Sequence, residues 1–328
     1  MLHRALWFQN LKQTKFIAAV IFVLFVIHLP FQTFVSIENW RTGTSRSLVE
    51  DQFYLIEIFS IGIMNFVILI VIVLFASLLI GAERNTRRND FTFSLPFSRN
   101  ELFFSKWLYG VGLLTILHFI NFFVAYMMIN QSEFSFMLEH ATFTELFIGP
   151  YLSFVLFFSF SLFIGSFTGE MISQIVLTFI FAGFPYGFYL LIFAAVDLHF
   201  RMVLNPSEWV LHLTLYFYTF SHMLPGYDMI IPIIGIGLFT IFGALLYKRN
   251  KIEHNGEFLL FKKLHPIFLI GMTICFSMFG GILISSIAPW NAHAIQITAY
   301  WGGFLLFAFF SYTLAKKLLK MNLTVKNK

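Results

Sequence analysis

The stretch IFSIGIMNFVILIVIVLFASLLIGA, residues 58–82, decides the fold class of this chain. It contains no charged residue, and it exceeds the roughly 20 residues that a helix needs to cross the hydrocarbon core of a bilayer. Backbone amides and carbonyls cannot remain unpaired in lipid, so the stretch must be helical despite its many Ile, Val and Phe residues. It therefore predicts one transmembrane helix.

Seven other stretches of the chain have the same character. Of the 328 residues, 59% are hydrophobic and only 11% are charged, which is outside the usual range for a soluble globular domain. We therefore expect an all-α polytopic membrane protein, a helical bundle of about eight transmembrane helices. The expected spans cover residues 16–37, 58–82, 107–129, 146–167, 174–196, 229–247, 266–288 and 294–315.

The basic residues predict how this bundle is oriented. If the N-terminus lies inside, eighteen of the 21 Lys and Arg residues fall in cytoplasmic segments, and only Arg41, Arg46 and Arg201 fall outside. Cytoplasmic loops of membrane proteins are enriched in Lys and Arg, so we expect both termini in the cytoplasm.

No Asp, Glu, Lys or Arg falls in the middle of an expected span. Carriers driven by ions or protons usually bury such groups as relays, because a charge in the bilayer is too costly to keep without a use. We therefore expect the energy for transport to arrive from outside the membrane domain.

Three polar residues inside the spans are candidates for function: Asn65, His118 and Asn121. His118 and Asn121 are three residues apart and share a helix face. Two roles stay open for such residues. They could line a substrate path, or they could hydrogen-bond to a neighbouring helix, which is the commoner role.

The usual signatures of catalysis and nucleotide binding are missing. The chain contains no H-E-x-x-H, G-x-S-x-G or C-x-x-C motif, and its single cysteine, Cys275, cannot form an intramolecular disulfide. No Gly-Lys dipeptide occurs, so the Walker A phosphate loop is absent from the sequence. We expect no catalytic residues, no metal site and no cofactor on this chain. If transport is driven by ATP, the ATP and Mg belong to a separate ATPase subunit.

After residue 82 the chain enters a charged segment, ERNTRRNDFTFSLPFSRNELFFSK, residues 83–106, which we call the first basic loop. Pro96 cannot sit comfortably inside a helix, so it separates two short elements. Ser98 and Glu101 form an S-x-x-E capping box, which predicts the start of a helix that continues into the third span.

The part of the first basic loop before Pro96 predicts a docking element. Phe91 and Leu95 are four residues apart and give it an apolar edge flanked by arginines. A short amphipathic helix of this kind suits a groove on a soluble partner. The alternative is a plain connection whose arginines contact anionic lipid headgroups.

The order of residues in this loop resembles a known family. Glu83 at the end of a span, then Leu95-Pro96-Phe97-Ser98-Arg99 and Lys106, is similar to the loop after the second span in permeases of the type-2 ABC exporter family. In that family an L-P-x-S-R stretch follows the short coupling helix that docks on the ATPase. Chain length, two additional helices and the high Phe content also resemble the permease subunits of the acetoin-utilisation (Ytr) ABC transporters of Gram-positive bacteria.

The resemblance implies a function and a set of partners. The chain would be the permease subunit of an ATP-binding-cassette exporter in the bacterial cytoplasmic membrane, moving a small metabolite, peptide or envelope compound. It would pair with a second permease subunit, identical or different, and with soluble ATPase subunits. The residues expected to couple to the ATPase are Glu83, Arg84, Arg87, Arg88, Phe91, Leu95, Pro96, Ser98, Arg99 and Lys106.

The resemblance also divides the single permease domain, residues 1–328, into parts. Residues 1–15 resemble an interfacial amphipathic helix, with a frayed tail as the alternative. Residues 197–228 resemble an outer re-entrant segment, with a ninth short span as the alternative. A second basic loop, residues 248–265, begins KRNKIEHNGEFLLFKK. It precedes two extra spans within 266–315 that the six-span family core lacks.

Two other classes of function remain open from the sequence. A stand-alone channel or ion-coupled secondary transporter would depend on an ion gradient and ignore ATP, although the lack of charge inside the spans disfavours it. A membrane enzyme using His or Asp residues at the outer interface would turn over substrate without a partner.

Overall fold

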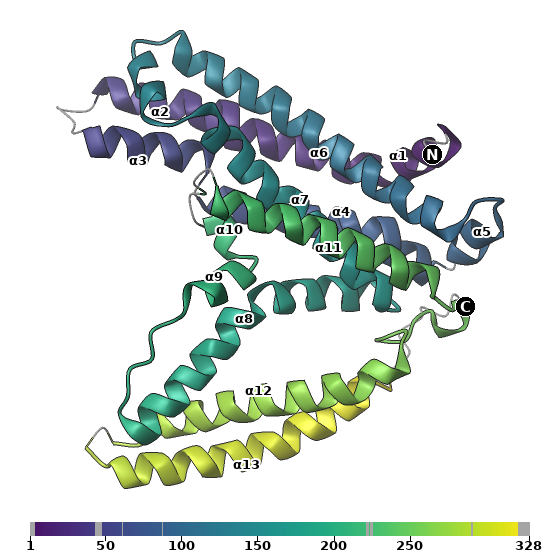
Figure 1. Cartoon of the computed structure of the whole chain (residues 1–328), viewed down its shortest axis with the longest axis vertical. Helices are drawn as coiled ribbons and strands as arrows, with labels where there is room; N and C mark the ends of the chain where they lie inside the picture. The colour runs from purple at the N-terminus through teal and green to yellow at the C-terminus, as the bar shows by residue number, and fades with distance from the viewer. Residues whose placement is uncertain are drawn as a thin grey trace.

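The computed structural model describes residues 4–42, 48–60, 62–86, 88–220, 223, 226–289 and 291–320 (Figure 1). Within these residues the regular structure is helical, apart from one isolated antiparallel bridge. The elements are α1 (Arg4–Val26), η1 (Ile27–Phe31), α2 (Gln32–Thr42), α3 (Leu48–Phe59), α4 (Ile63–Asn85), α5 (Arg88–Ser94), α6 (Arg99–Asn130), η2 (Ser135–His140), α7 (Phe143–Phe167), α8 (Met171–Phe200), α9 (Glu208–Leu213), α10 (Phe217–Phe220), α11 (Tyr227–Lys248), η3 (Ile252–His254), η4 (Lys262–Leu264), α12 (His265–Ser285) and α13 (His293–Leu318).

Eight helical stretches among the described residues are long and apolar enough to cross a membrane. Each overlaps one of the eight expected spans, so the prediction of an all-α, polytopic bundle is confirmed. The helices extend beyond the apolar stretches because polar residues at the interface continue them. For example, α6 begins at Arg99, because Ser98 caps it there.

Helix α7 forms the centre of the bundle, where it contacts α4, α6, α8 and α11. It is apolar on all sides, as expected of a helix surrounded by protein. Phe154, Phe157 and Phe158 are almost completely buried. The Phe158 ring packs directly on Gly110 of α6, where any side chain would overlap it.

The first span is one long helical stretch with an internal distortion. Pro30 has no amide hydrogen, and its ring clashes with the Val26 carbonyl in a regular helix, so residues 27–31 widen into the π-helix η1. Residues 4–15 are the first turns of α1 and continue into the span without a break. The expected division between an interfacial helix, residues 1–15, and the first span is therefore not marked by a break in the helix. Residues 1–3 lie outside the described part of the chain. Thr14 hydrogen-bonds across to Tyr109 of α6 at 2.8 Å.

Helix α8 bends in the middle (Figure 1). The segment that follows α8 forms hydrogen bonds with the backbone groups at this bend. Pro185 lies inside the helix, so its missing amide hydrogen and its ring disturb the hydrogen bonds of the preceding turn. The Ala182 carbonyl accepts from Leu215, and the Tyr186 amide donates to Thr214 Oγ1. The chain thus returns to the middle of α8 through α9 and residues 214–215, and α10 then packs on α7.

The last two spans form a hairpin. Helices α12 and α13 pack along one another and contact α8, and Figure 1 shows them set apart from the bundle of α1–α7 and α11. His293 of α13 hydrogen-bonds to the Leu198 carbonyl of α8 at 2.7 Å. These helices are the two additional stretches expected within residues 266–315.

Candidate functional site

The first basic loop carries the short helix α5 at its tip. Helix α4 ends at Asn85, α5 follows, and a turn through residues 95–97 leads to α6. The Glu101 amide donates to the Ser98 hydroxyl, and the Ser98 amide donates to Glu101 Oε2 at 2.8 Å. The predicted capping box is present, and it fixes the angle at which the loop joins α6.

One side of α5 faces away from the bundle. The Phe91 side chain is 66% exposed, and Arg88, Ser94 and Pro96 are exposed as well. Thr92, the next residue along the helix, is buried. The segment lies outside the candidate membrane spans, so lipid tails do not explain the exposed phenylalanine.

The two ends of the first basic loop are joined by a buried ion pair. Lys106 Nζ lies 2.6 Å from Glu83 Oε1 and donates a second hydrogen bond to the Leu79 carbonyl at 2.6 Å. The two side chains are only 3% and 2% exposed. Removing either charge would leave its partner uncompensated in a low-dielectric environment, so the pair holds α4 and α6 in a fixed register.

Arg84 connects the same end of α4 to the end of α7. Its buried guanidinium donates to the Gly165 and Thr168 carbonyls, which the last turn of α7 leaves without helical partners. Next to it, Asn85 Oδ1 accepts a hydrogen bond from the Met171 amide at 3.1 Å, at the start of α8. The α7–α8 turn is therefore held from the α4 side.

The second basic loop holds this turn from the other side. Thr168 and Leu259 form the isolated antiparallel bridge, and the Gly256 amide donates to the Gly169 carbonyl at 2.9 Å. A side chain on Gly169 would overlap the Glu257 backbone oxygen. We call residues 83–85, 165–171 and 256–260 the junction, because both basic loops meet there.

Arg99 joins the two basic loops directly. Its guanidinium donates to the Asn250 carbonyl and lies 4.3 Å from the centre of the Phe93 ring. The Phe93 ring in turn packs edge-on against Tyr247, the penultimate residue of α11, with a centroid distance of 5.6 Å. A displacement of α5 would therefore reach α11 through Phe93 and Arg99.

One carboxyl group at the junction has a shifted pKa. Glu170 is buried, with 2% of its surface exposed, and burial raises the pKa of its carboxyl group. The Ser173 hydroxyl donates to Glu170 Oε1 at 2.7 Å, which offsets part of this shift.

Comparison with known proteins places the loops in a family. Residues 7–185 match the ABC-2 family transporter proteins, and this range includes the first basic loop and the α7–α8 turn. The chain belongs to the ABC-2 transporter family. The resemblance expected from the first basic loop is thereby confirmed.

Two relatives of this ABC-2 chain come from Bacillus subtilis (strain 168). The probable ABC transporter permease YtrC is 26% identical over 231 residues, which cover 63% of this chain and 68% of the relative. The probable ABC transporter permease YtrD is 26% identical over 213 residues, covering 61% and 63%. The matches thus span about two thirds of the relatives' lengths. No solved structure matches the chain.

The structure divides the residues expected to couple this ABC-2 chain to an ATPase. Glu83, Arg84 and Lys106 are buried and contact the bundle, while Leu95 and Arg99 are half-buried. Arg87 lies outside the described residues. The exposed members of the set are Arg88, Phe91, Pro96 and Ser98.

Several residues that position the loop were not singled out from the sequence. Phe93 could have been found, because it lies two residues from Phe91 and therefore points to a different side of a helix. The other residues are Asn85, Gly169, Tyr247 and Asn250, whose roles depend on segments far apart in the chain.

The three polar residues expected in a substrate path are buried inside the bundle. His118 Nε2 lies 3.2 Å from the Phe147 carbonyl of α7, which is a contact between helices. Asn121 donates to Leu117 within its own helix, and Asn65 donates to the Ser60 carbonyl, each at 2.8 Å. Among the described residues no cluster of His, Cys, Asp or Glu could hold a metal ion.

Proposed function

We propose that this chain is the membrane-spanning subunit of an ATP-driven exporter whose ATPase binds α5. The observation that carries the proposal is an exposed Phe91 on a short helix whose base is held by buried charges. A docking helix that is held rigidly against the bundle passes a displacement on to it, whereas a helix on a mobile loop would move without displacing the bundle.

The proposed coupling runs from the ATPase into the bundle. Phe91 fills a groove on the ATPase, and Arg88 and Arg99 contribute charge at its rim. When the ATPase subunits close on ATP and Mg, α5 moves as a lever. The movement passes through Arg99 and Phe93 to α11, and through Arg84 to the α7–α8 turn.

The remaining parts of the proposal rest on family membership and on the distribution of charge. The relatives are described as permeases, so we place this chain in a bacterial cytoplasmic membrane with a second permease subunit and soluble ATPase subunits. The excess of Lys and Arg at one end of the bundle supports termini on the cytoplasmic side. The cargo is a small metabolite, peptide or envelope compound, and export is its direction. Asn65, His118 and Asn121 remain candidates for its path.

The test is purification of the tagged full-length chain in mild detergent, with mass spectrometry of its partners and an ATPase assay. We expect a subunit with a Walker A loop to co-purify, and we expect Phe91→Ala to reduce its yield and the ATPase activity at least tenfold. The control is Phe200→Ala. Phe200 has a similar exposure (69%) and lies at the C-terminal end of α8, away from the α7–α8 turn. Neither substitution should change the thermal midpoint of the isolated chain.

Two outcomes would contradict the proposal. A Phe91→Ala chain that retains its ATPase as well as the Phe200→Ala control does would exclude α5 as the docking element. A wild-type chain that purifies alone, while transport follows an ion gradient without ATP, would favour the secondary transporter.

A further inference from the structure

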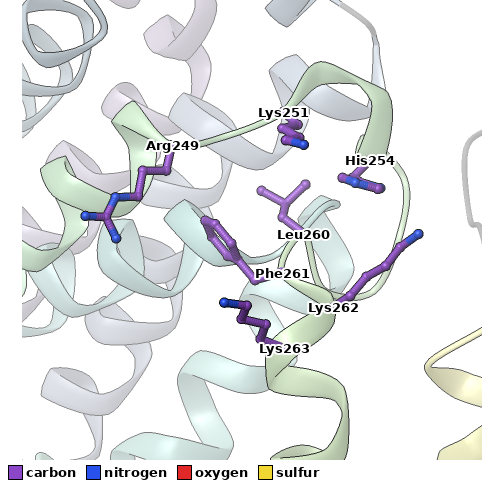
Figure 2. A pocket seen from close by; sticks show the side chains of 7 residues that line it. All are labelled: Arg249, Lys251, His254, Leu260, Phe261, Lys262 and Lys263. Atoms are coloured by element: carbon purple, nitrogen blue, oxygen red, sulfur yellow. The ribbon is translucent and has the colours of Figure 1, made fainter.

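A basic pocket lies in the second basic loop, between the end of α11 and the start of α12. It encloses about 260 Å³ and is lined by Arg249, Lys251, His254, Leu260, Phe261, Lys262 and Lys263 (Figure 2). Figure 2 shows Lys251 and His254 on one side of Leu260, and Lys262 and Lys263 on the other. This volume is below the usual range for drug-sized ligands, and the stems of the basic side chains rather than their charged ends form most of its wall.

Four of the five basic side chains of this pocket have no acidic partner among the described residues. His254 Nδ1 contacts Glu257 Oε1 at 2.9 Å, so one basic side chain is already paired. Arg249, Lys251, Lys262 and Lys263 have no carboxylate within ion-pair distance among the residues that the structure describes. Four like charges within one short loop repel each other, and an anion bound among them would relieve this repulsion.

The pocket also lies at the level of the membrane interface. One candidate span ends at Lys248 and the next begins at Lys262, so the lining residues lie between the two spans or at the start of the second. Phosphate groups of lipids occupy this level of a bilayer.

The surfaces below the pocket are suited to acyl chains. On α11, Ile241, Phe242 and Leu245 are exposed within two turns of the pocket. On α12, Ile267 and Ile270 are exposed within the first two turns. A free phosphate ion would gain nothing from these side chains, whereas a lipid would contact them and the cations together.

We propose that the basic residues around this pocket bind the phosphate group of an anionic phospholipid. The lipid headgroup lies among Lys251, Lys262 and Lys263, and its acyl chains lie along α11 and α12. Because residues 256–260 also bridge to the α7–α8 turn, the bound lipid stabilises the second basic loop at the junction.

The test compares lipid binding to two full-length variants by native mass spectrometry after delipidation in detergent. The first variant carries Lys251→Gln, Lys262→Gln and Lys263→Gln. The matched control carries Lys316→Gln, Lys317→Gln and Lys320→Gln, which remove the same charge from the end of α13 outside the pocket. Each chain is titrated with phosphatidylglycerol, phosphatidylcholine and inorganic phosphate.

We expect the wild-type chain and the control to bind phosphatidylglycerol at least tenfold more tightly than phosphatidylcholine. The pocket variant should lose at least tenfold in affinity for phosphatidylglycerol, which is about 1.4 kcal/mol, because basic residues near an anionic headgroup attract it. A variant with Arg in place of the three lysines should retain tight binding. Equal circular dichroism spectra and thermal midpoints would show that all variants are folded.

Three results would overturn the proposal. Equal affinity of the pocket variant and the control would exclude the three lysines from the site. Displacement of the lipid by excess inorganic phosphate would identify a free phosphate as the ligand. Unchanged lipid binding together with loss of the ATPase partner would identify the pocket as a protein contact. The lipid assay uses the isolated chain, so it remains informative even if the proposed ATPase partner is wrong.

Discussion

The two basic loops have similar compositions but use their charges differently. In the first loop, Glu83 and Arg84 lie at the end of α4 and Lys106 lies about two turns into α6; both helices pack on α7, and the three charges are buried in specific contacts. In the second loop, the cations lie between α11, which packs on α7, and α12, which packs on α13 and α8 rather than on the centre of the bundle. A basic segment is therefore rigid where both flanking helices pack on the centre of the bundle, and open to ligands where one of them does not.

The largest effect is expected where the first loop buries a charge. Lys106→Met should cost about 3–5 kcal/mol, because it leaves Glu83 buried without its partner. The measurement is the thermal midpoint of the purified chain, followed by size-exclusion chromatography. The double variant Glu83→Gln, Lys106→Met should recover much of the loss.

Lys317→Met is the control from an exposed site and should change stability by less than about 0.5 kcal/mol. If Lys106→Met were as stable as this control, the contrast between buried and open cations would not hold.

The next effect tests the contact between the two loops. Gly169→Ala would push a methyl group into the Glu257 backbone oxygen, and we expect a cost of roughly 1–3 kcal/mol. Since the second loop would then detach from the junction, trypsin should cleave it faster. Gly187→Ala is the matched control, because beyond its own helix backbone and chain neighbours no atom lies within 4 Å of the added carbon. Equal cleavage rates for the two variants would refute the contact.

A smaller effect is expected at the link between Arg99 and Asn250. Arg99→Gln removes a hydrogen bond and a cation over the Phe93 ring, which together contribute about 1–2 kcal/mol. Arg99→Lys keeps the charge but not the planar fork, so it should be intermediate. The measurement is the thermal midpoint of each variant, with exposed Arg88→Gln as the control. We expect the loss of stability to be largest for Arg99→Gln, smaller for Arg99→Lys and smallest for Arg88→Gln. If Arg99→Lys were as stable as the wild-type chain, the charge alone would be sufficient. If Arg99→Gln were as stable as Arg88→Gln, neither the charge nor the planar guanidinium of Arg99 would contribute.

The smallest effect concerns pH at the junction. Because burial raises the pKa of Glu170, the folded state holds its proton more tightly than the unfolded state does. Stability is therefore fullest below the ordinary glutamate pKa, and it falls as pH rises through the raised value. Thermal midpoints from about pH 4 to about pH 8 should show this decline in the wild-type chain. The decline in thermal midpoint should be weaker in Glu170→Gln. If the two chains had identical pH profiles, the decline would come from other titrating groups.

Local sequence rules were sufficient for several elements of the structure. The capping box at Ser98 and Glu101 starts α6 as expected, because its two hydrogen bonds join residues only three apart. Pro96 ends the α5 segment, and Pro30 and Pro185 distort α1 and α8, because proline acts on its own turn. The continuity of residues 4–15 with the first span was not foreseen, since an amphipathic helix and the start of a span have the same local pattern.

The sequence by itself determined that this chain forms a bundle of membrane-spanning helices, because lipid leaves the backbone no other way to pair its polar groups. It also located the loop that carries α5. Only the tertiary structure decided which charges of that loop are buried and which are exposed. Arg84 and Arg88 are chemically identical, and Arg84 is buried because the carbonyl groups of a helix some eighty residues away in the chain end beside it.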